Sequence, residues 1–248
     1  MRLAKGVYLV GGGDFAFNLS GRLDCHIYLI DGGSELALID AGLGLAGSID
    51  LVVENIREDG LDPARIGKLI LTHAHADHAG GAREIRDRFY CEVLVPHDIA
   101  YALQQADEEA ISLQYAKDAG FYPPEYHFPA CPVDQEVRED DVIQVGSLSL
   151  TAYETPGHSA GHISYLMRGA DRTFLFGGDL VFWGGKVLLQ NIPDCSIQAY
   201  ADSVMKIEKL DFDALLPGHL SVSLRDGKRH IDSAAASFRK LGIPPNIL

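Results

Sequence analysis

The chain has 248 residues, of which 47% are apolar, and its formal net charge at pH 7 is −14. This length and composition fit one large globular domain, and no stretch approaches the ~20 apolar residues of a membrane-spanning helix. The acidic balance disfavours nucleic acid as a partner, because that binding depends on Lys and Arg displacing counterions from phosphates. The first apolar run, residues 7–10, ends in three glycines and is too short for a secretory leader. We therefore expect a cytoplasmic protein that acts on a small molecule, with no membrane partner; its oligomeric state is left open.

The first half of the chain alternates short strand patterns with helical patterns. The strand patterns are rich in branched residues, are bounded by Gly, Asp or Pro, and cover residues 7–10, 25–30, 36–40, 69–72 and 92–95. Asp31-Gly32-Gly33 predicts a hairpin turn between two of them. Apolar residues at helical spacing predict helices over 49–58 and 79–89.

Residues 97–133 interrupt this alternation. The pattern is helical over 99–119, and an aromatic stretch punctuated by proline follows. We interpret this segment as a helical insertion, within a single domain over 1–248, that could overhang a site. The second half repeats the earlier order, with strand patterns at 142–145, 148–154, 163–167, 173–176 and 214–216 and helical patterns at 197–210 and 231–241.

Residues 72–81 read Thr-His-Ala-His-Ala-Asp-His-Ala-Gly-Gly and lie between a predicted strand and a predicted helix. Four potential metal ligands, His73, His75, Asp77 and His78, are therefore crowded into six residues. Without a metal, imidazoles this close would repel one another once protonated, whereas a bound cation removes that cost. Imidazole and carboxylate ligands without a thiolate suit zinc, iron or manganese.

Three later segments each lead from an apolar strand pattern into a glycine-containing turn that carries one further potential ligand. These ligands are His158, Asp179 and His219. Repetition of this arrangement indicates a site built at the edge of a sheet.

The chain resembles the metallo-β-lactamase-fold hydrolases over nearly its whole length. Their His-x-His-x-Asp-His motif is matched by residues 73–78, and their later ligands by His158, Asp179 and His219. The resemblance implies an α+β fold, a four-layer αβ/βα sandwich of two pseudo-equivalent halves. It also implies two divalent metal ions, zinc being expected and iron or manganese being alternatives.

The same resemblance implies a role for each ligand. His73, His75 and His158 would hold one ion, Asp77, His78 and His219 the other, and Asp179 would bridge them. Asp40, at the end of a predicted strand, would accept a hydrogen bond that orients a ligand histidine or caps the metal-binding loop. The alternative for Asp40 is an ordinary turn carboxylate. A hydroxide shared by the ions would attack the carbonyl of a thioester, ester or lactone, with Asp77 as the catalytic residue that orients it.

Other candidate residues have weaker support. Phe182 and Trp183 follow Asp179 in a glycine-broken segment, which fits a substrate-binding wall and core packing equally well. His26 is expected to be a half-buried strand residue and His162 a helical residue or a support for a ligand. His97, His127 and His230 are expected at the surface.

The motifs leave the substrate open. Gly178-Asp179-Leu-Val-Phe182 resembles glyoxalase II, a thioesterase, although only residues 220–248 follow the last ligand, where that family has a helical domain that contacts glutathione. Residues 155–162 resemble acyl-homoserine lactonases, although those carry tyrosine at the position of Phe182. A β-lactamase is less favoured, and the acidic charge disfavours an RNA phosphodiesterase. A persulfide dioxygenase, with one iron held by two histidines and the Asp, is a further alternative; a non-catalytic binding module is disfavoured by the complete ligand set.

Overall fold

The computed structural model describes residues 1–15 and 17–247 and contains two mixed β-sheets. The larger sheet follows chain order: β1 (Arg2–Ala4), β2 (Val7–Gly11), β3 (Ile27–Asp31), β4 (Leu36–Ile39), β5 (Ile66–Ile70), β6 (Glu92–Pro96) and β7 (Gln135–Val137). Neighbouring strands pair antiparallel from β1 to β4 and parallel from β4 to β7. In the parallel part, β4 and most of β6 are buried apolar runs, as strands covered on both faces require, whereas the edge strand β7 exposes Gln135 and Glu136.

The smaller sheet repeats this plan. Its order is β8 (Val142–Val145), β9 (Leu148–Glu154), β10 (Ile163–Arg168), β11 (Thr173–Gly178) and β12 (Ala214–Pro217). Strands β8 to β11 pair antiparallel, and β11 pairs parallel with β12. Each sheet thus begins as an antiparallel meander and ends with parallel strands, as expected of two pseudo-equivalent halves.

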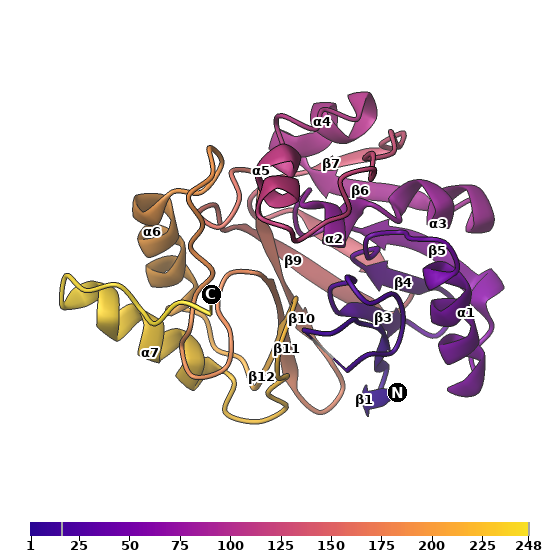
Figure 1. The fold of residues 1–248 in the computed structure, drawn as a ribbon. Helices are drawn as coiled ribbons and strands as arrows, with labels where there is room; N and C mark the ends of the chain where they lie inside the picture. The colour runs from indigo at the N-terminus through magenta and orange to yellow at the C-terminus, as the bar shows by residue number, and fades with distance from the viewer. Residues whose placement is uncertain (16, 248) are drawn as a thin grey trace.

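The helices lie on the outer faces of the two sheets (Figure 1). Helices α1 (Ser48–Glu58), α2 (Ala76–Ala79) and α3 (Ala82–Phe89) accompany the larger sheet, and α6 (Ile197–Ile207) and α7 (Lys228–Arg239) cover the smaller one. Apolar side chains of both sheets, among them Leu9, Ile30, Phe176 and Leu216, form a core between the sheets. Separate cores join each sheet to its helices. The four-layer αβ/βα sandwich expected from the sequence is confirmed.

The predicted helix over 79–89 is wrong in its start and its continuity. Helix α2 already begins at Ala76, and the chain is interrupted at Gly80 and Gly81 before α3. The backbone of residues 41–43 passes so close that a Cβ at Gly80 would lie 2.4 Å from Leu43 O. A Cβ at Gly81 would lie 2.2 Å from Ala41 O. Both glycines are therefore required by this close approach.

The insertion contains two short helices rather than the single helix expected over 99–119. They are α4 (Ala100–Gln105) and α5 (Leu113–Asp118), after the 3-10 turn η2 (His97–Ile99). Ala106 ends α4 in the left-handed region, with φ of 53°. The Asp107 side chain then accepts a hydrogen bond from Ala110 N, a local turn that competes with helix continuation. The other 3-10 turn, η1 (Pro63–Arg65), precedes β5.

None of the helices in the described residues is long and apolar enough to span a membrane.

Candidate metal centre

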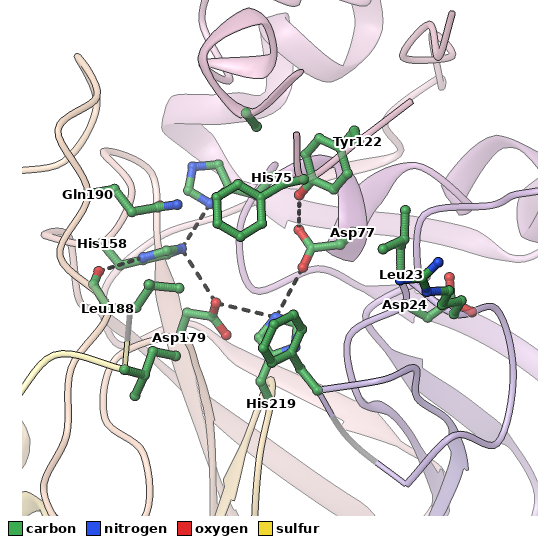
Figure 2. A pocket seen from close by; sticks show the side chains of 15 residues that line it. Leu23, Asp24, His75, Asp77, Tyr122, His158, Asp179, Leu188, Gln190 and His219 are labelled. Atoms are coloured by element: carbon green, nitrogen blue, oxygen red, sulfur yellow. Dashed lines mark hydrogen bonds and ion pairs between the residues drawn. The ribbon is translucent and has the colours of Figure 1, made fainter. Parts of the chain in front are cut away.

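The seven predicted ligands converge at the ends of strands. Residues 73–78 follow β5, His158 follows β9, Asp179 follows β11 and His219 follows β12. Figure 2 shows five of them, His75, Asp77, His158, Asp179 and His219, directed into one cavity. Ligand atoms of His73, His75 and His158 lie within 4.8 Å of one another, as do those of Asp77, His78 and His219.

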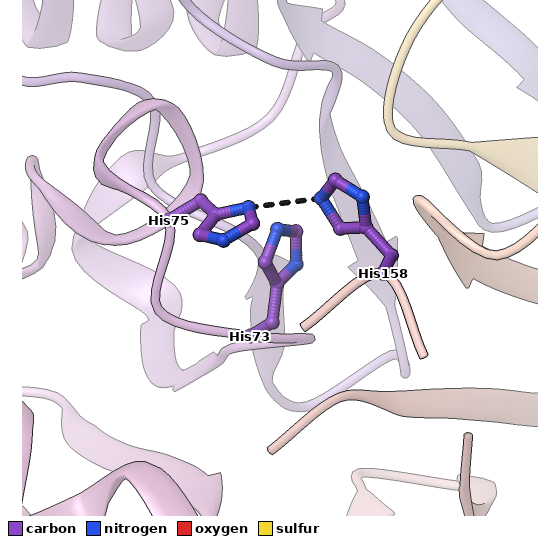
Figure 3. A group of neighbouring side chains, drawn as sticks. All are labelled: His73, His75 and His158. Atoms are coloured by element: carbon purple, nitrogen blue, oxygen red, sulfur yellow. Dashed lines mark hydrogen bonds between the residues drawn. The ribbon is translucent and has the colours of Figure 1, made fainter. Parts of the chain in front are cut away.

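The first group, His73, His75 and His158, consists of imidazoles held close to one another (Figure 3). His75 Nδ1 lies 2.8 Å from His158 Nε2, and the buried His73 Nε2 has no hydrogen-bond partner. Burial, together with the neighbouring His75, lowers the pKa of His158 to about 4. Burial and the charge of His78 lower the pKa of His73 well below its usual value. The His73 and His158 rings are therefore neutral at pH 7 and have lone pairs available for a metal ion.

The second group, Asp77, His78 and His219, pairs a carboxylate with two imidazoles. His219 Nε2 lies 3.0 Å from Asp77 Oδ2 and 3.3 Å from His78 Nε2. Burial raises the pKa of Asp77, but the charges of His78 and His219 outweigh it and lower that pKa. Burial lowers the pKa of His219, but the neighbouring Asp179 and Asp77 carboxylates raise it overall. In the metal-free protein, the His219 proton is thus held beside the Asp77 and Asp179 carboxylates. A cation bound at the same place would displace it.

Asp179 lies between the two groups. Its Oδ2 is 3.5 Å from His158 Nε2 and 3.5 Å from His219 Nε2, and its Oδ1 is 3.5 Å from His78 Nε2. Oδ1 is buried without a hydrogen-bond partner. This is the position that a bridging carboxylate needs. The unpartnered His73 Nε2 and Asp179 Oδ1, in a set of nitrogen and oxygen donors, fit divalent metal ions.

Cys25 is close to this centre but does not complete it. Its Sγ is within reach of Asp40 and His78, and the thiol is fully buried. Burial raises its pKa to about 12, so the group stays a neutral thiol. The donor set therefore remains nitrogen and oxygen.

Residues behind the ligands fix their orientation. Asp40 Oδ2 accepts a hydrogen bond of 2.8 Å from His78 Nδ1, and Asp40 Oδ1 accepts one from Thr72 N. This is the contact expected of Asp40 from the sequence. His162 Nε2 accepts from Asp179 N at 3.1 Å, while its Nδ1 bonds Thr155 Oγ1, so His162 supports a ligand-bearing turn.

Sequence reasoning missed Asp194, Ser112 and the role of Tyr122. Asp194 Oδ2 accepts a hydrogen bond of 3.1 Å from His75 Nε2, and Ser112 Oγ donates to Asp194 Oδ1. Tyr122 donates to Asp77 Oδ1 at 2.6 Å (Figure 2). No motif marks Asp194 or Ser112; the aromatic stretch was the one available signal for Tyr122.

Several expectations about other residues are corrected. His26 is fully buried rather than half-buried, and its Nδ1 donates to Pro217 O. His230 is buried rather than at the surface, and its Nδ1 accepts a hydrogen bond from Gly184 N. Phe182 is buried and Trp183 is 45% exposed beside His230 and Arg229. Neither Phe182 nor Trp183 lines the cavity, so we propose no substrate contact for them.

The cavity above the ligands has mainly apolar walls. It measures about 100 Å³, and its walls include Phe15, Leu23, Phe121, Tyr122 and Leu188. Arg22 and Asp24 supply charge on one side.

The Metallo-beta-lactamase superfamily profile matches residues 20–219, so the chain belongs to that superfamily. Among its relatives, the human acyl-coenzyme A thioesterase MBLAC2 is 31% identical over 212 residues, which cover 79% of this chain and 73% of the relative. A hydroxyacylglutathione hydrolase of Rhodopseudomonas palustris (strain HaA2) is 31% identical over 118 residues, which cover 48% of this chain and 35% of that protein.

The solved structures that resemble this one show the same fold at low identity. The subclass B3 metallo-beta-lactamase BJP-1 of Bradyrhizobium japonicum has a TM-score of 0.73 at 24% identity, covering 97% of this chain and 92% of its own. The FEZ-1 metallo-beta-lactamase from Legionella gormanii has a TM-score of 0.74 at 22% identity, covering 97% and 94%. The buried histidine and aspartate clusters are consistent with a metal site of this superfamily.

Proposed function

We propose that the protein is a dinuclear metal-dependent hydrolase that cleaves an acyl thioester. The observation that carries this proposal is the convergence of seven histidine and aspartate side chains at one centre, five of which line an apolar-walled cavity. Among the described residues, His73 Nε2 and Asp179 Oδ1 lack hydrogen-bond partners. Thioesters are favoured because MBLAC2 and the hydroxyacylglutathione hydrolases are named for thioester hydrolysis.

Four ligand histidines have one nitrogen held by an oxygen partner outside the ligand set and the other directed at the centre. His75 Nε2 donates to Asp194, His78 Nδ1 donates to Asp40 and His158 Nδ1 donates to Leu188 O. Thr72 Oγ1 gives its proton to Asp40 and therefore accepts from His73 Nδ1. These bonds select the tautomer whose free nitrogen can bind a metal ion.

The metal ions, when bound, would polarise the substrate carbonyl and lower the pKa of an attacking water. Asp77 is the residue of this chain placed to receive the proton of that water. Tyr122 holds its Oδ1, and Oδ2 faces His219 in the cavity. The apolar walls would exclude bulk water and strengthen these interactions.

Two alternatives have less support. A lactonase of the homoserine type would use a tyrosine hydroxyl at position 182, whereas Phe182 is buried and has none. A one-iron dioxygenase would need only two histidines and Asp179, whereas Asp77, His78 and His219 form a further complete group.

A substrate panel tests the proposal. Protein loaded with zinc, manganese or iron would be assayed against acyl thioesters, aryl esters, homoserine lactones, a β-lactam and a phosphodiester, with oxygen uptake recorded on a persulfide. We expect thioester hydrolysis that a chelator abolishes and added metal restores. Persulfide-dependent oxygen uptake, or turnover of lactone or β-lactam without thioester, would overturn the proposal.

A further inference from the structure

A second cavity adjoins the metal centre. It has a volume of about 320 Å³ and lies between α5 with its flanking turns and the segment 189–192. His75, Phe121, Tyr122 and Gln190 line both this groove and the metal cavity, so the two are continuous. Figure 2 shows His75, Tyr122 and Gln190 along the upper side of the metal cavity, where the two spaces meet. We call the second space the α5 groove.

The walls of the α5 groove are mainly hydrocarbon. Ile111, Tyr115 and Ala119 form one side, and Leu189 and Ile192 form the other. Among the described residues that line it, none is Lys, Arg, Asp or Glu. A phosphate or carboxylate would therefore lose its hydration there without gaining a cationic partner, whereas an aliphatic chain would gain from burial.

The hydroxyl groups at the inner end of the groove are engaged, whereas the neutral Gln190 amide has its Oε1 buried without a hydrogen-bond partner among the described residues. The Ser112 hydroxyl donates to Asp194, and Asp194 accepts from His75. The Tyr122 hydroxyl donates to Asp77. The described groove therefore presents no charged group to a bound substrate. The same hydrogen bonds connect the wall of the groove to the metal centre.

Charge distinguishes the two spaces. The metal cavity carries Arg22 and Asp24 on its wall. The exposed Arg22 guanidinium pairs with Asp14 through Nε, so its terminal nitrogens are the part that a polar leaving group could contact. The α5 groove instead begins at His75 and Tyr122, beside the ligands that would face a scissile carbonyl. A thioester whose carbonyl lies at the ligands can thus place its acyl chain in one space and its thiol leaving group in the other, and the two spaces differ in charge.

We propose that the α5 groove binds the acyl chain of the substrate and makes the enzyme selective for aliphatic acyl groups longer than acetyl. This inference rests on the proposed thioesterase function. The thiol leaving group then occupies the cavity near Phe15 and Arg22. Each methylene that enters the groove should raise kcat/KM by about fourfold, the factor that corresponds to ~0.8 kcal/mol of burial.

A chain-length series tests the groove. Acetyl, butanoyl, hexanoyl, octanoyl and dodecanoyl thioesters of N-acetylcysteamine would be assayed with wild type and with Ala119→Phe. Ala119 lines the α5 groove but not the metal cavity, and it follows α5 with an exposed side chain, so the larger side chain should narrow the groove. We expect the octanoyl-to-acetyl ratio of kcat/KM to be high in wild type and to fall at least about tenfold in the variant.

Two further variants separate this effect from general damage. Gln114→Phe places the same aromatic side chain at an exposed α5 position outside both cavities and should leave the ratio unchanged. Ile192→Ser removes apolar wall without adding bulk and should lower the ratio too, even if Ala119→Phe fails to fold. A flat chain-length dependence in wild type, or an equal fall in Gln114→Phe, would overturn the proposal.

A binding measurement distinguishes failure of the groove from failure of the thioesterase proposal. The probe is S-decyl-N-acetylcysteamine, a thioether that cannot be hydrolysed, titrated calorimetrically into the zinc-loaded proteins. We expect wild type to bind it and Ala119→Phe to bind it at least about tenfold more weakly. Binding without any thioester turnover would support the groove and overturn the thioesterase function; turnover with no thioether binding would overturn the groove alone.

Discussion

Two side chains outside the ligand set, Tyr122 of the insertion and Asp194 of a later loop, form hydrogen bonds with ligands. Asp194 accepts from His75, and Tyr122 donates to Asp77. Burial raises the pKa of Asp194, but the hydrogen bond from His75 outweighs it and lowers that pKa to about 2. Asp194 is therefore ionised at pH 7, and its charge favours the His75 tautomer in which Nδ1 faces the centre.

Replacing Asp194 by Asn should weaken metal binding at the first group. The amide has a single acceptor oxygen and no charge to hold the His75 Nε2 proton. Loss of such a support typically weakens metal binding about ten- to a hundredfold. Competition with a chromophoric chelator would measure the affinity. Asp202→Asn, at an exposed α6 position bonded only to Gln198, is the control; equal affinities in both variants would refute this role.

Replacing Tyr122 by Phe should impair the second group while keeping the ring. A hydrogen bond to a charged group contributes about 1.5–3 kcal/mol, which corresponds to about ten- to a hundredfold in affinity for the second ion or in kcat. Chelator competition and steady-state kinetics would measure both. Tyr126→Phe is the matched control, because Tyr126 belongs to the same segment but donates to Leu43 O. A Tyr122→Phe variant indistinguishable from this control would contradict the positioning role.

At the scale of elements, strand ends deliver the ligands and glycines make room for them. Asp40, Asp179 and His219 each follow a strand directly or within two residues. A Cβ built at Gly218 would lie 2.2 Å from Asp179 Oδ1 and 2.6 Å from His78 Cε1. Gly218 therefore allows the β12 turn to approach Asp179 and the second group of ligands.

Gly218→Ala should displace Asp179 or His78 and reduce turnover strongly. A misplacement of ~1 Å at a reacting centre can cost about a hundredfold in rate. Gly177→Ala, whose Cβ would meet only the flexible end of Leu215 at 3.2 Å, should have a much smaller effect. Comparison of kcat and of metal content per chain would check this, and equal losses in the two variants would count against it.

Elements with a clear apolar pattern were predictable from the sequence, and tertiary contacts were not. The strands around Leu38 and Phe176 were found because burial on both faces leaves an uninterrupted apolar run. The break at Gly80-Gly81 depends on a distant backbone approaching the helix, which no local pattern reveals. The contact of Asp194 with His75 joins residues 119 positions apart and carries no motif.

At the scale of the whole molecule, the acidic chain places most of its buried histidines at or beside one centre. Burial lowers the pKa of His26 to about 4 and that of His162 to about 3, so both are neutral in the folded protein at pH 7. In the unfolded chain their pKa returns to about 6.5. Below that value the unfolded state binds protons that the folded state does not.

Metal-free protein should therefore lose stability as the pH falls from about 6.5 towards 4. The slope is up to ~1.4 kcal/mol per pH unit for each such histidine. Within this window the raised pKa of His219 adds no opposing slope, because its contribution is already complete below about 6.5. Urea unfolding of chelator-treated protein across this range would measure the effect, and an unchanged or rising free energy of unfolding would contradict it.

The central claim is that two groups of ligands, joined by Asp179, hold two metal ions. Elemental analysis of purified wild type and of Asp179→Ala, after equilibration with zinc and removal of excess metal, tests it most directly. We predict close to two ions per chain in wild type, and loss of second-site occupancy and of turnover in Asp179→Ala. One ion or fewer in wild type, or an unchanged count and rate in Asp179→Ala, would contradict the account.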